Sequence, residues 1–217
     1  RLSEAGVQPL KKLGQNFLVN PQICQKILYV VKTFNPQSVV EIGPGLGAIT
    51  DDLITGPWKT TLVELDSGLV KYWTAKQPNL EVLHQDALKI DWSKLQFPKP
   101  CVLVSNLPYS IAASLVVEMS AVAEPVFDGM VLMFQKEVAQ RIEAQIDDED
   151  YGMLSIIAQS SWDIEKVIDA GPQDFHPVPN VGSRVLSFKW RPTDPDRVGL
   201  LKFLKMAFAQ RRKKLVS

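Results

Sequence analysis

The chain has 217 residues, of which 46% are hydrophobic and 22% charged, a composition typical of a folded globular domain and not of a disordered or fibrous protein. Its 24 basic and 24 acidic residues balance to a formal net charge of zero, which argues against a strongly basic nucleic-acid-binding domain. No apolar run approaches the roughly 20 residues that a membrane-spanning helix needs, so we expect no membrane partner.

The start of the chain and its potential metal ligands exclude further classes. The opening RLSEAGVQPLKK has no apolar stretch behind its basic residues, which is unlike a secretory signal, and the absence of an initiating Met predicts that upstream residues are missing. Cys24 and Cys101 stand in apolar segments, and His84 and His176 are isolated, so we expect neither disulfides nor a metal site. These features fit a reducing compartment, which is the cytoplasm, or an organelle matrix or stroma if a targeting segment is missing.

Hydrophobic periodicity predicts strands that alternate with helices. We expect strands at 38–42, 59–65, 81–84, 101–105 and 130–134, and helices at 21–33, 50–53, 67–76, 111–121 and 135–145. A late strand pair is expected at 162–168 and 184–190, joined by the proline-rich GPQDFHPVPN as an irregular loop. This alternation predicts an α/β fold with a parallel, doubly wound, Rossmann-like sheet, whose ligands bind outside the carboxyl ends of the strands.

A proline pair, Pro192 and Pro195, marks the predicted end of this domain. We assign residues 1–190 to the catalytic domain. Residues 191–217 are expected to form a linker and the first helix, at 200–208, of a small helical C-terminal domain that is largely absent. That helix runs into the basic sequence QRRKK.

A glycine-rich turn, EIGPGLGAIT at 41–50, follows a predicted strand and opens a helix. Gly43, Gly45 and Ala48 satisfy the pattern G-x-G-x-x-G/A, in which glycines let the backbone approach a ligand closely. Glu64 lies 64 − 43 = 21 residues after Gly43, at the end of the next strand, where a carboxylate can accept hydrogen bonds from ribose hydroxyls. The pattern predicts an adenosine-containing cofactor and leaves both a nicotinamide oxidoreductase and an S-adenosyl-L-methionine enzyme open.

The third strand end adds a second carboxylate. Asp86 and Ala87 follow the strand at 81–84. The Asp86 carboxylate could accept from an adenine amine while backbone amides meet the ring nitrogens. The alternative is that Asp86 caps the next helical segment.

The tetrapeptide NLPY at 106–109 follows the fourth strand and suits the chemistry of an adenine amine. That nitrogen is a poor nucleophile because its lone pair is delocalised into the ring. Two acceptors off the ring plane, the Asn106 side-chain oxygen and the Leu107 carbonyl, would direct the lone pair toward a methyl donor. Pro108 fixes φ and removes a competing donor, and Tyr109 offers a face on which a base can stack. The motif favours methyl transfer without a general base. Its alternative is a helix N-cap at Asn106 with Pro108 and Tyr109 as turn and core.

With these motifs the chain resembles the rRNA adenine N6-dimethyltransferase family over nearly its whole length. The matching stretches are KKLGQNFLVNPQI (11–23), VVEIGPGLGAIT (39–50), LVELD (62–66), HQDAL (84–88), SNLPYSI (105–111), FQKEVAQRI (134–142), YGMLSIIAQ (151–159), FHPVPNVGSRVL (175–186) and AFAQRRKKL (207–215). The resemblance implies S-adenosyl-L-methionine-dependent dimethylation of two adjacent adenines near the 3′ end of small-subunit rRNA during ribosome biogenesis. It also implies an immature small ribosomal subunit as partner, and we expect a monomer.

The resemblance implies specific site residues as well. Asn16 and Leu18 would close over the methionine end of the cofactor, and Phe175 would face the target base, with core packing as the alternative for Phe175. The full set of implied cofactor contacts is Asn16, Leu18, Gly43, Gly45, Glu64, Asp86, Ala87 and Asn106.

Two positions bear on the branch of the family. NLPY, rather than NIPY, favours the small-subunit branch over the antibiotic-resistance branch that modifies large-subunit rRNA. Asn180 stands where the family commonly has Lys, which removes one basic contact to RNA. The alternatives that stay open are that large-subunit methyltransferase, an RNA- or ribosome-binding assembly factor with a non-catalytic cofactor site, and the oxidoreductase.

Overall fold

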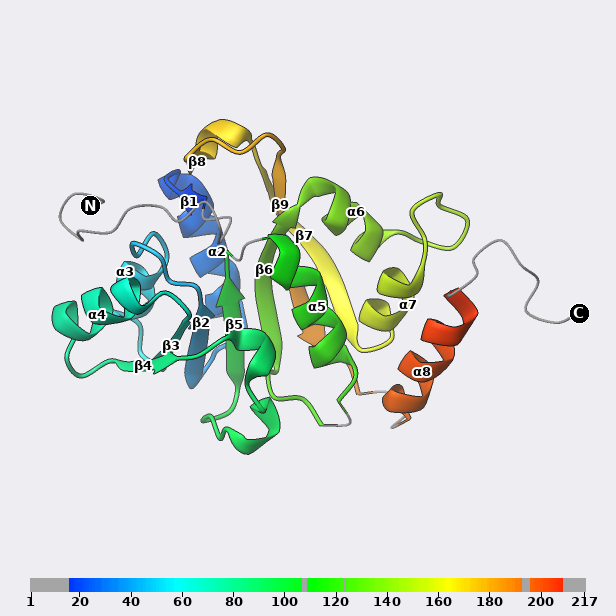
Figure 1. Cartoon of the computed structure of the whole chain (residues 1–217), viewed down its shortest axis with the longest axis horizontal. Coiled ribbons are helices and arrows are strands. Elements are labelled where there is room, and N and C mark those ends of the chain that lie inside the picture. Colours follow the sequence, from blue (N-terminus) through cyan, green and yellow to red (C-terminus); the bar gives the residue numbers. More distant parts are fainter. Residues whose placement is uncertain (1–15, 107–108, 123, 193–195, 209–217) are drawn as a thin grey trace, which may run out of the picture.

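The computed structural model describes residues 16–106, 109–122, 124–192 and 196–208, which form a sheet covered by helices on both faces (Figure 1). Its strands are β2 (Ser38–Ile42), β3 (Lys59–Glu64), β4 (Glu81–His84), β5 (Cys101–Ser105), β6 (Gly129–Gln135), β7 (Trp162–Ala170) and β9 (Ser183–Trp190), with a separate short pair, β1 (Phe17–Leu18) and β8 (Phe175–His176). The α-helices are α2 (Pro21–Thr33), α3 (Thr50–Leu53), α4 (Ser67–Lys76), α5 (Tyr109–Ser120), α6 (Lys136–Glu143), α7 (Met153–Gln159) and α8 (Arg197–Phe208). Short 3₁₀ turns lie at η2 (Ala87–Lys89), η3 (Trp92–Lys94) and η4 (Pro172–Asp174).

The seven-stranded sheet has the order β4-β3-β2-β5-β6-β9-β7. The first five strands are parallel, whereas β9 is antiparallel to both β6 and β7. The expected α/β Rossmann-like sheet is confirmed, but a wholly parallel sheet is wrong, because β9 runs opposite to the other six strands. A parallel return needs a crossover, usually a helix, and the stretch between β7 and β9 contains only η4 and β8, so the chain reverses direction.

The order of strands reverses direction between β2 and β5, which places a topological switch point there. The carboxyl ends of these two strands are joined by a hydrogen bond of 2.6 Å from the Ser105 hydroxyl to the Ile42 carbonyl. Because ligands in such sheets bind in the crevice at the switch point, the glycine turn after β2 and the Asn106 segment after β5 face the same crevice.

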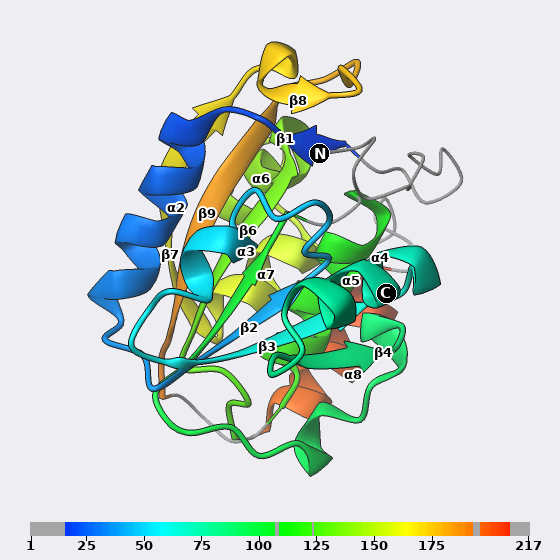
Figure 2. The ribbon, with the colours of Figure 1, turned by 90° about the vertical axis from the view of Figure 1, so that its left-hand side faces the viewer.

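The core lies on both faces of the sheet, since the central strands send alternate side chains to opposite sides. In β5, Leu103 joins a cluster with α5 residues, and Val102 and Val104 join a second cluster with α2 residues. Figure 2 shows α2 and α5 on opposite sides of the sheet. Cys24 and Cys101 are both buried, as expected for small apolar residues.

Helix α2 has the bounds expected from its sequence. Asn20 accepts a hydrogen bond of 2.9 Å from the Gln22 amide, and Pro21 fills the first helical position. The helix buries Ile23, Ile27 and Val31, which recur every four residues along one face. The bounds of β2, α3, α4, β4 and β5 are also as expected, whereas other boundaries move by one to three residues. For example, α5 begins at Tyr109 instead of 111, and α6 ends at Glu143 instead of 145.

The stretch GPQDFHPVPN is not wholly irregular, contrary to expectation. It contains η4 and β8, and β8 pairs with β1 so that Leu18 lies opposite Phe175 and Phe17 opposite His176. Figures 1 and 2 both show the two short strands side by side at one edge of the molecule. The pair of strands β1 and β8 therefore joins segments that are about 155 residues apart in the sequence, and it lies next to the crevice.

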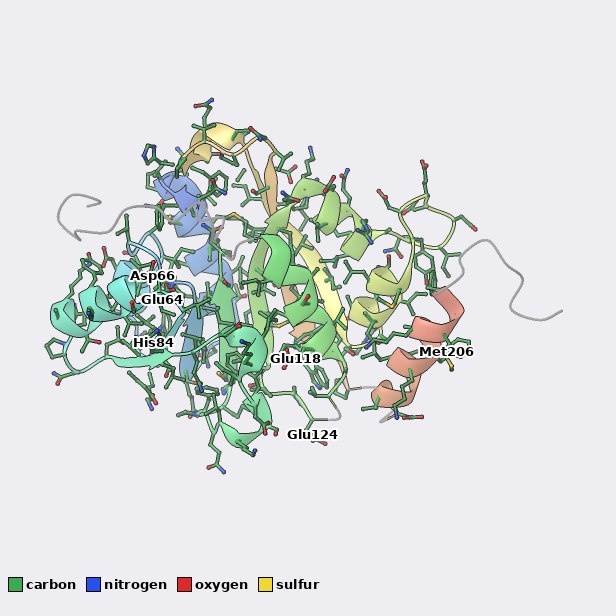
Figure 3. The ribbon with its side chains drawn as sticks, viewed as in Figure 1. Glu64, Asp66, His84, Glu118, Glu124 and Met206 are labelled. Carbon is green, nitrogen blue, oxygen red and sulfur yellow. The ribbon has the colours of Figure 1, made fainter. Side chains whose placement is uncertain are left out.

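Helix α8 packs against α7, with Leu204 buried, while Met206 is exposed on the side of the molecule away from Glu64 (Figure 3). The domain boundary at 190/191 stays a prediction, and the basic residues at 211–214 lie outside the described residues. No helix in the described part of the chain is long and apolar enough to cross a membrane.

Candidate functional site

The glycine turn after β2 has a backbone that only glycine adopts readily. Gly43, Gly45 and Gly47 have φ of 68°, 53° and 90°, in the left-handed region. A Cβ on Gly45 would also stand 3.0 Å from the ring of Phe17 in β1. The two glycines predicted to line the cofactor path therefore lie in a left-handed turn at the switch point, next to β1.

Glu64, at the end of β3, is a buried carboxylate held by backbone amides. Its Oε1 accepts hydrogen bonds from the Leu65 and Asp66 amides at 2.7 and 2.8 Å. Burial raises the pKa of Glu64, and these amide hydrogen bonds oppose that shift. The carboxylate is thus fixed at the crevice with limited access to water, which suits a hydrogen-bond acceptor for ribose hydroxyls.

Asp66 lies beside Glu64 (Figure 3) and begins α4. Its Oδ1 accepts from the Gly68 amide at 2.7 Å and so caps the helix. Its Oδ2 is buried and has no hydrogen-bond partner among the described residues. A buried acceptor without a partner among the described residues therefore stands next to Glu64, at a residue that was not predicted to belong to the site.

Glu41, in β2 directly before the turn, is another carboxyl group that sequence reasoning missed. Burial raises the pKa of Glu41 to about 8, opposed by a hydrogen bond with Thr50 and reinforced by the negative charges of Glu64 and Asp51. Its Oε2 has no partner within the described part of the chain. The available signal was a charged residue inside the apolar run SVVEI, because every position of this central strand is buried.

Asp86 caps a helical segment, so the alternative prediction for this residue is confirmed. Its Oδ1 accepts from the Leu88 amide at 3.1 Å and caps η2, and its Oδ2 lies 3.7 Å from the Lys89 ammonium. Ala87 is buried, and its carbonyl accepts from the Trp92 indole at 3.1 Å. A contact from Asp86 or Ala87 to an adenine ring stays a prediction.

Asn106 reaches from the end of β5 to the segment before β1. Its Nδ2 donates to the Asn16 carbonyl at 3.3 Å. Because this bond uses the amide nitrogen, it fixes the side-chain orientation and leaves Oδ1 as an acceptor. Leu107 and Pro108 lie outside the described residues, as does the Tyr109 side chain, so their predicted roles stay predictions.

Phe175 and Leu18 are core residues in this structure, 2% and 3% exposed, and both belong to the cluster beneath α2. For Phe175 this agrees with the alternative of core packing, and a role facing the target base stays a prediction. Asp174 holds the pair of strands β1 and β8 in place. Its backbone carbonyl accepts from the Val19 amide at 2.8 Å, and its carboxylate accepts from the Asn20 side chain at 2.7 Å. Sequence reasoning did not find Asp174, because its partners are distant in the chain.

The acidic side chains near the glycine turn are largely neutralised within the protein. Glu41, with a pKa of about 8, holds its proton at neutral pH, and Asp51 is paired with Lys76 at 2.6 Å. Glu64 therefore stands as the carboxylate at this edge that a ligand can use as an acceptor. No group of metal-ligating side chains occurs within the described residues. The fold and the site together define a Rossmann-like methyltransferase.

The chain belongs to the ribosomal RNA adenine dimethylase family, whose sequence model matches residues 8–217. It is 50% identical to a ribosomal RNA small subunit methyltransferase A of Bdellovibrio bacteriovorus, over 99% of this chain and 78% of that protein. It is 38% identical to the protein of the same name from Syntrophotalea carbinolica, over 96% of this chain and 80% of that one. The resemblance inferred from the motifs is confirmed.

Solved structures agree with this assignment. A dimethyladenosine transferase from Plasmodium falciparum superposes with a TM-score of 0.75 at 31% identity, over 92% of this chain and 73% of that one. The 23S rRNA methyltransferase ErmE has a TM-score of 0.67 at 24% identity, over 89% of this chain and 79% of that one, and shows the shared fold.

Proposed function

We propose that this protein dimethylates N6 of two adjacent adenines near the 3′ end of small-subunit rRNA, using S-adenosyl-L-methionine, on an immature small ribosomal subunit. The single observation that supports it most is the Asn106 side chain, whose nitrogen donates to Asn16 and whose oxygen stays available at the switch point. The names of the relatives support the choice of small-subunit rRNA.

In this proposal some residues bind the cofactor and others orient the target base. Glu64 is held by two amides so that its carboxylate can accept from ribose hydroxyls, and the glycine turn allows the backbone to approach the cofactor. When bound, S-adenosyl-L-methionine supplies a methyl group on a positively charged sulfur.

Asn106 orients the target amine. Its Oδ1 accepts a hydrogen bond from the N6 amino group and directs the nitrogen lone pair toward the methyl carbon. The bond to Asn16 prevents the amide from turning its nitrogen toward the amine, where two donors would repel each other. The nitrogen loses its proton after methyl transfer, so orientation and proximity provide the rate enhancement without a basic side chain.

Transfer of labelled methyl groups from S-adenosyl-L-methionine to undermethylated small ribosomal subunits tests the proposal, with mature small subunits and large subunits as controls. We expect two methyl groups on each of two adjacent adenines in the undermethylated small subunits only. Asn106→Ala should lower kcat by about a thousand-fold, the size reported for loss of a transition-state hydrogen bond, whereas the exposed Asn79→Ala should not.

The other outcomes separate the alternatives. Methylation of large subunits instead would favour the antibiotic-resistance type of activity. Cofactor binding without transfer to any subunit would favour an assembly factor with a non-catalytic site. Full activity of Asn106→Ala would refute the role of Asn106 while leaving the reaction itself standing.

A further inference from the structure

Helix α4 contacts the glycine turn through a buried tryptophan. The Trp73 side chain is fully buried, and its indole Nε1 donates to the Gly45 carbonyl at 2.9 Å. Trp73 is one of the largest buried side chains, yet it belongs to neither of the two clusters that line the faces of the sheet. The Trp73 ring packs instead against the glycine turn.

The Gly45 peptide is held on both of its sides. Its carbonyl accepts from Trp73, and on the other side its amide stands close enough to Glu64 to lower the pKa of that carboxyl group. The Trp73 ring also supports Gly47, since a Cβ on Gly47 would stand only 2.9 Å from a ring carbon. The indole thus fills the space beneath the turn and fixes the direction of one of its carbonyls.

Lys76, one helical turn after Trp73, makes a second connection. Its Nζ lies 2.6 Å from Oδ1 of Asp51 in α3 and 4.6 Å from the centre of the Trp73 ring. The Asp51 amide in turn donates to the Gly47 carbonyl at 3.3 Å. Both ends of the turn are therefore tied to α4, through Trp73 at Gly45 and through Lys76 and Asp51 at Gly47.

The N-terminal end of α4 lies next to Glu64, the residue proposed to bind ribose. Asp66 caps the helix, and its amide donates to Glu64. A single helix thus connects the carboxylate proposed to bind ribose with the turn proposed to accommodate the rest of the cofactor. A displacement of one contact relative to the other would have to deform the helix or its packing.

We propose that Trp73 is a positioning residue for cofactor binding, which sets the glycine turn at a fixed distance from Glu64 through its indole N–H and its ring. This inference rests on the proposed function, because it concerns the same cofactor. Trp73 itself needs no contact with the cofactor, since it acts through Gly45 and Gly47.

The test compares Trp73→Phe with Trp162→Phe. Trp162 is equally buried and also donates its indole N–H to an internal acceptor, Ser120 Oγ at 3.0 Å, but it lies in the cluster with Phe188 on the face that carries α5. Both variants keep an aromatic ring and lose one indole hydrogen bond, so we expect similar losses of stability. Isothermal titration with S-adenosyl-L-methionine should give a Kd about five-fold higher for Trp73→Phe and unchanged for Trp162→Phe.

A spectroscopic measurement tests whether cofactor binding changes the surroundings of Trp73. Excitation at 295 nm should reveal a change of tryptophan emission when S-adenosyl-L-methionine binds the wild-type protein and Trp162→Phe, and little change in Trp73→Phe. Equal affinities of the two variants, or an emission change that persists in Trp73→Phe, would overturn the inference. Failure of the wild-type protein to bind the cofactor would instead overturn the proposed function and this inference with it.

Discussion

Two regions of the sheet shift the pKa values of their carboxyl groups in opposite directions. At the switch point, Glu41 and Glu64 are buried with raised pKa values, and Oε2 of Glu41 has no hydrogen-bond partner among the described residues. At the other end of the sheet, Arg184 in β9 lies between Asp169 and Glu143, with N···O distances of 2.6 and 2.7 Å. The hydrogen bonds of Arg184 hold the pKa of Asp169 well below its usual range.

The difference in the pairing of the carboxyl groups indicates the role of each region. A paired carboxylate is stabilised in its charged form and contributes to the fold, whereas a buried carboxylate without a cation costs free energy until a ligand compensates it. Among the described residues, no cationic side chain forms an ion pair with the Glu41 or Glu64 carboxyl group. Perturbed carboxylates in a crevice are typical of functional sites, and the paired network at β9 is typical of structural ones.

Replacing Glu64 should have the largest effect on cofactor affinity. Glu64→Gln removes the charge that strengthens hydrogen bonds to ribose hydroxyls, so the Kd for S-adenosyl-L-methionine should rise about fifty-fold. The free energy of unfolding should change by less than about 1 kcal/mol, because the buried charge has no cation to lose. Isothermal titration and urea unfolding measure the two quantities.

Glu81→Gln is the matched control for Glu64. Glu81 stands in the neighbouring strand β4 but is paired, 2.7 Å from Lys59. We expect its replacement to leave the cofactor Kd within about two-fold, since it does not face the crevice. Similar losses of affinity in both variants would mean that net charge, and not the Glu64 position, governs binding.

Replacing Arg184 should produce the converse result. Arg184→Met leaves Asp169 and Glu143 without their cation, and because the Arg184 side chain is only 14% exposed, the loss should be about 2 kcal/mol of unfolding free energy. Cofactor affinity should not change. The exposed Lys59→Met breaks an ion pair of the same length and should cost less than about 0.5 kcal/mol. A loss of cofactor affinity in Arg184→Met would contradict the division between the two regions.

The sequence predicted local features well, because their causes are local. The bounds of α2 follow from Asn20 and Pro21 at its start, and the strands β2, β4 and β5 follow from short apolar runs that end in turn residues. The glycine turn and Glu64 were also found, since their spacing in the chain reflects one strand–helix–strand unit.

What the sequence did not reveal depends on contacts between distant segments. The pairing of β1 with β8 involves two residues on each side, too few to form a pattern. The antiparallel direction of β9 has no trace in hydrophobic periodicity, which is the same for either direction. Trp73 looks like an ordinary apolar residue of an amphipathic helix, and only the fold places its indole against Gly45.

The pH dependence of stability should show a smaller but specific effect at Glu41. Its pKa of about 8 in the folded protein lies above the value of 4.5 expected for an unperturbed Glu, so the folded chain holds a proton that the unfolded chain releases between these pH values. The contribution of Glu41 to stability is therefore full below about pH 4.5 and is lost as the pH rises toward 8. Glu64 and Asp51 add to this loss, because their negative charges oppose ionisation of Glu41.

Glu41→Gln isolates that contribution, since Gln keeps the shape and cannot ionise. The free energy of unfolding of the wild-type protein should fall with rising pH more steeply than that of the variant, by up to about 1.4 kcal/mol per pH unit for one proton. Urea unfolding at half-unit steps from pH 5 to 8.5 measures the two slopes, with Glu81→Gln as a variant whose curve should stay parallel to the wild type in this range, because pairing with Lys59 lowers the pKa of Glu81. Parallel curves for Glu41→Gln and wild type would mean that Glu41 is already ionised in the folded protein. The carboxylate would then need a cation in the crevice even before the cofactor binds, and the contrast with the paired network around Arg184 would disappear.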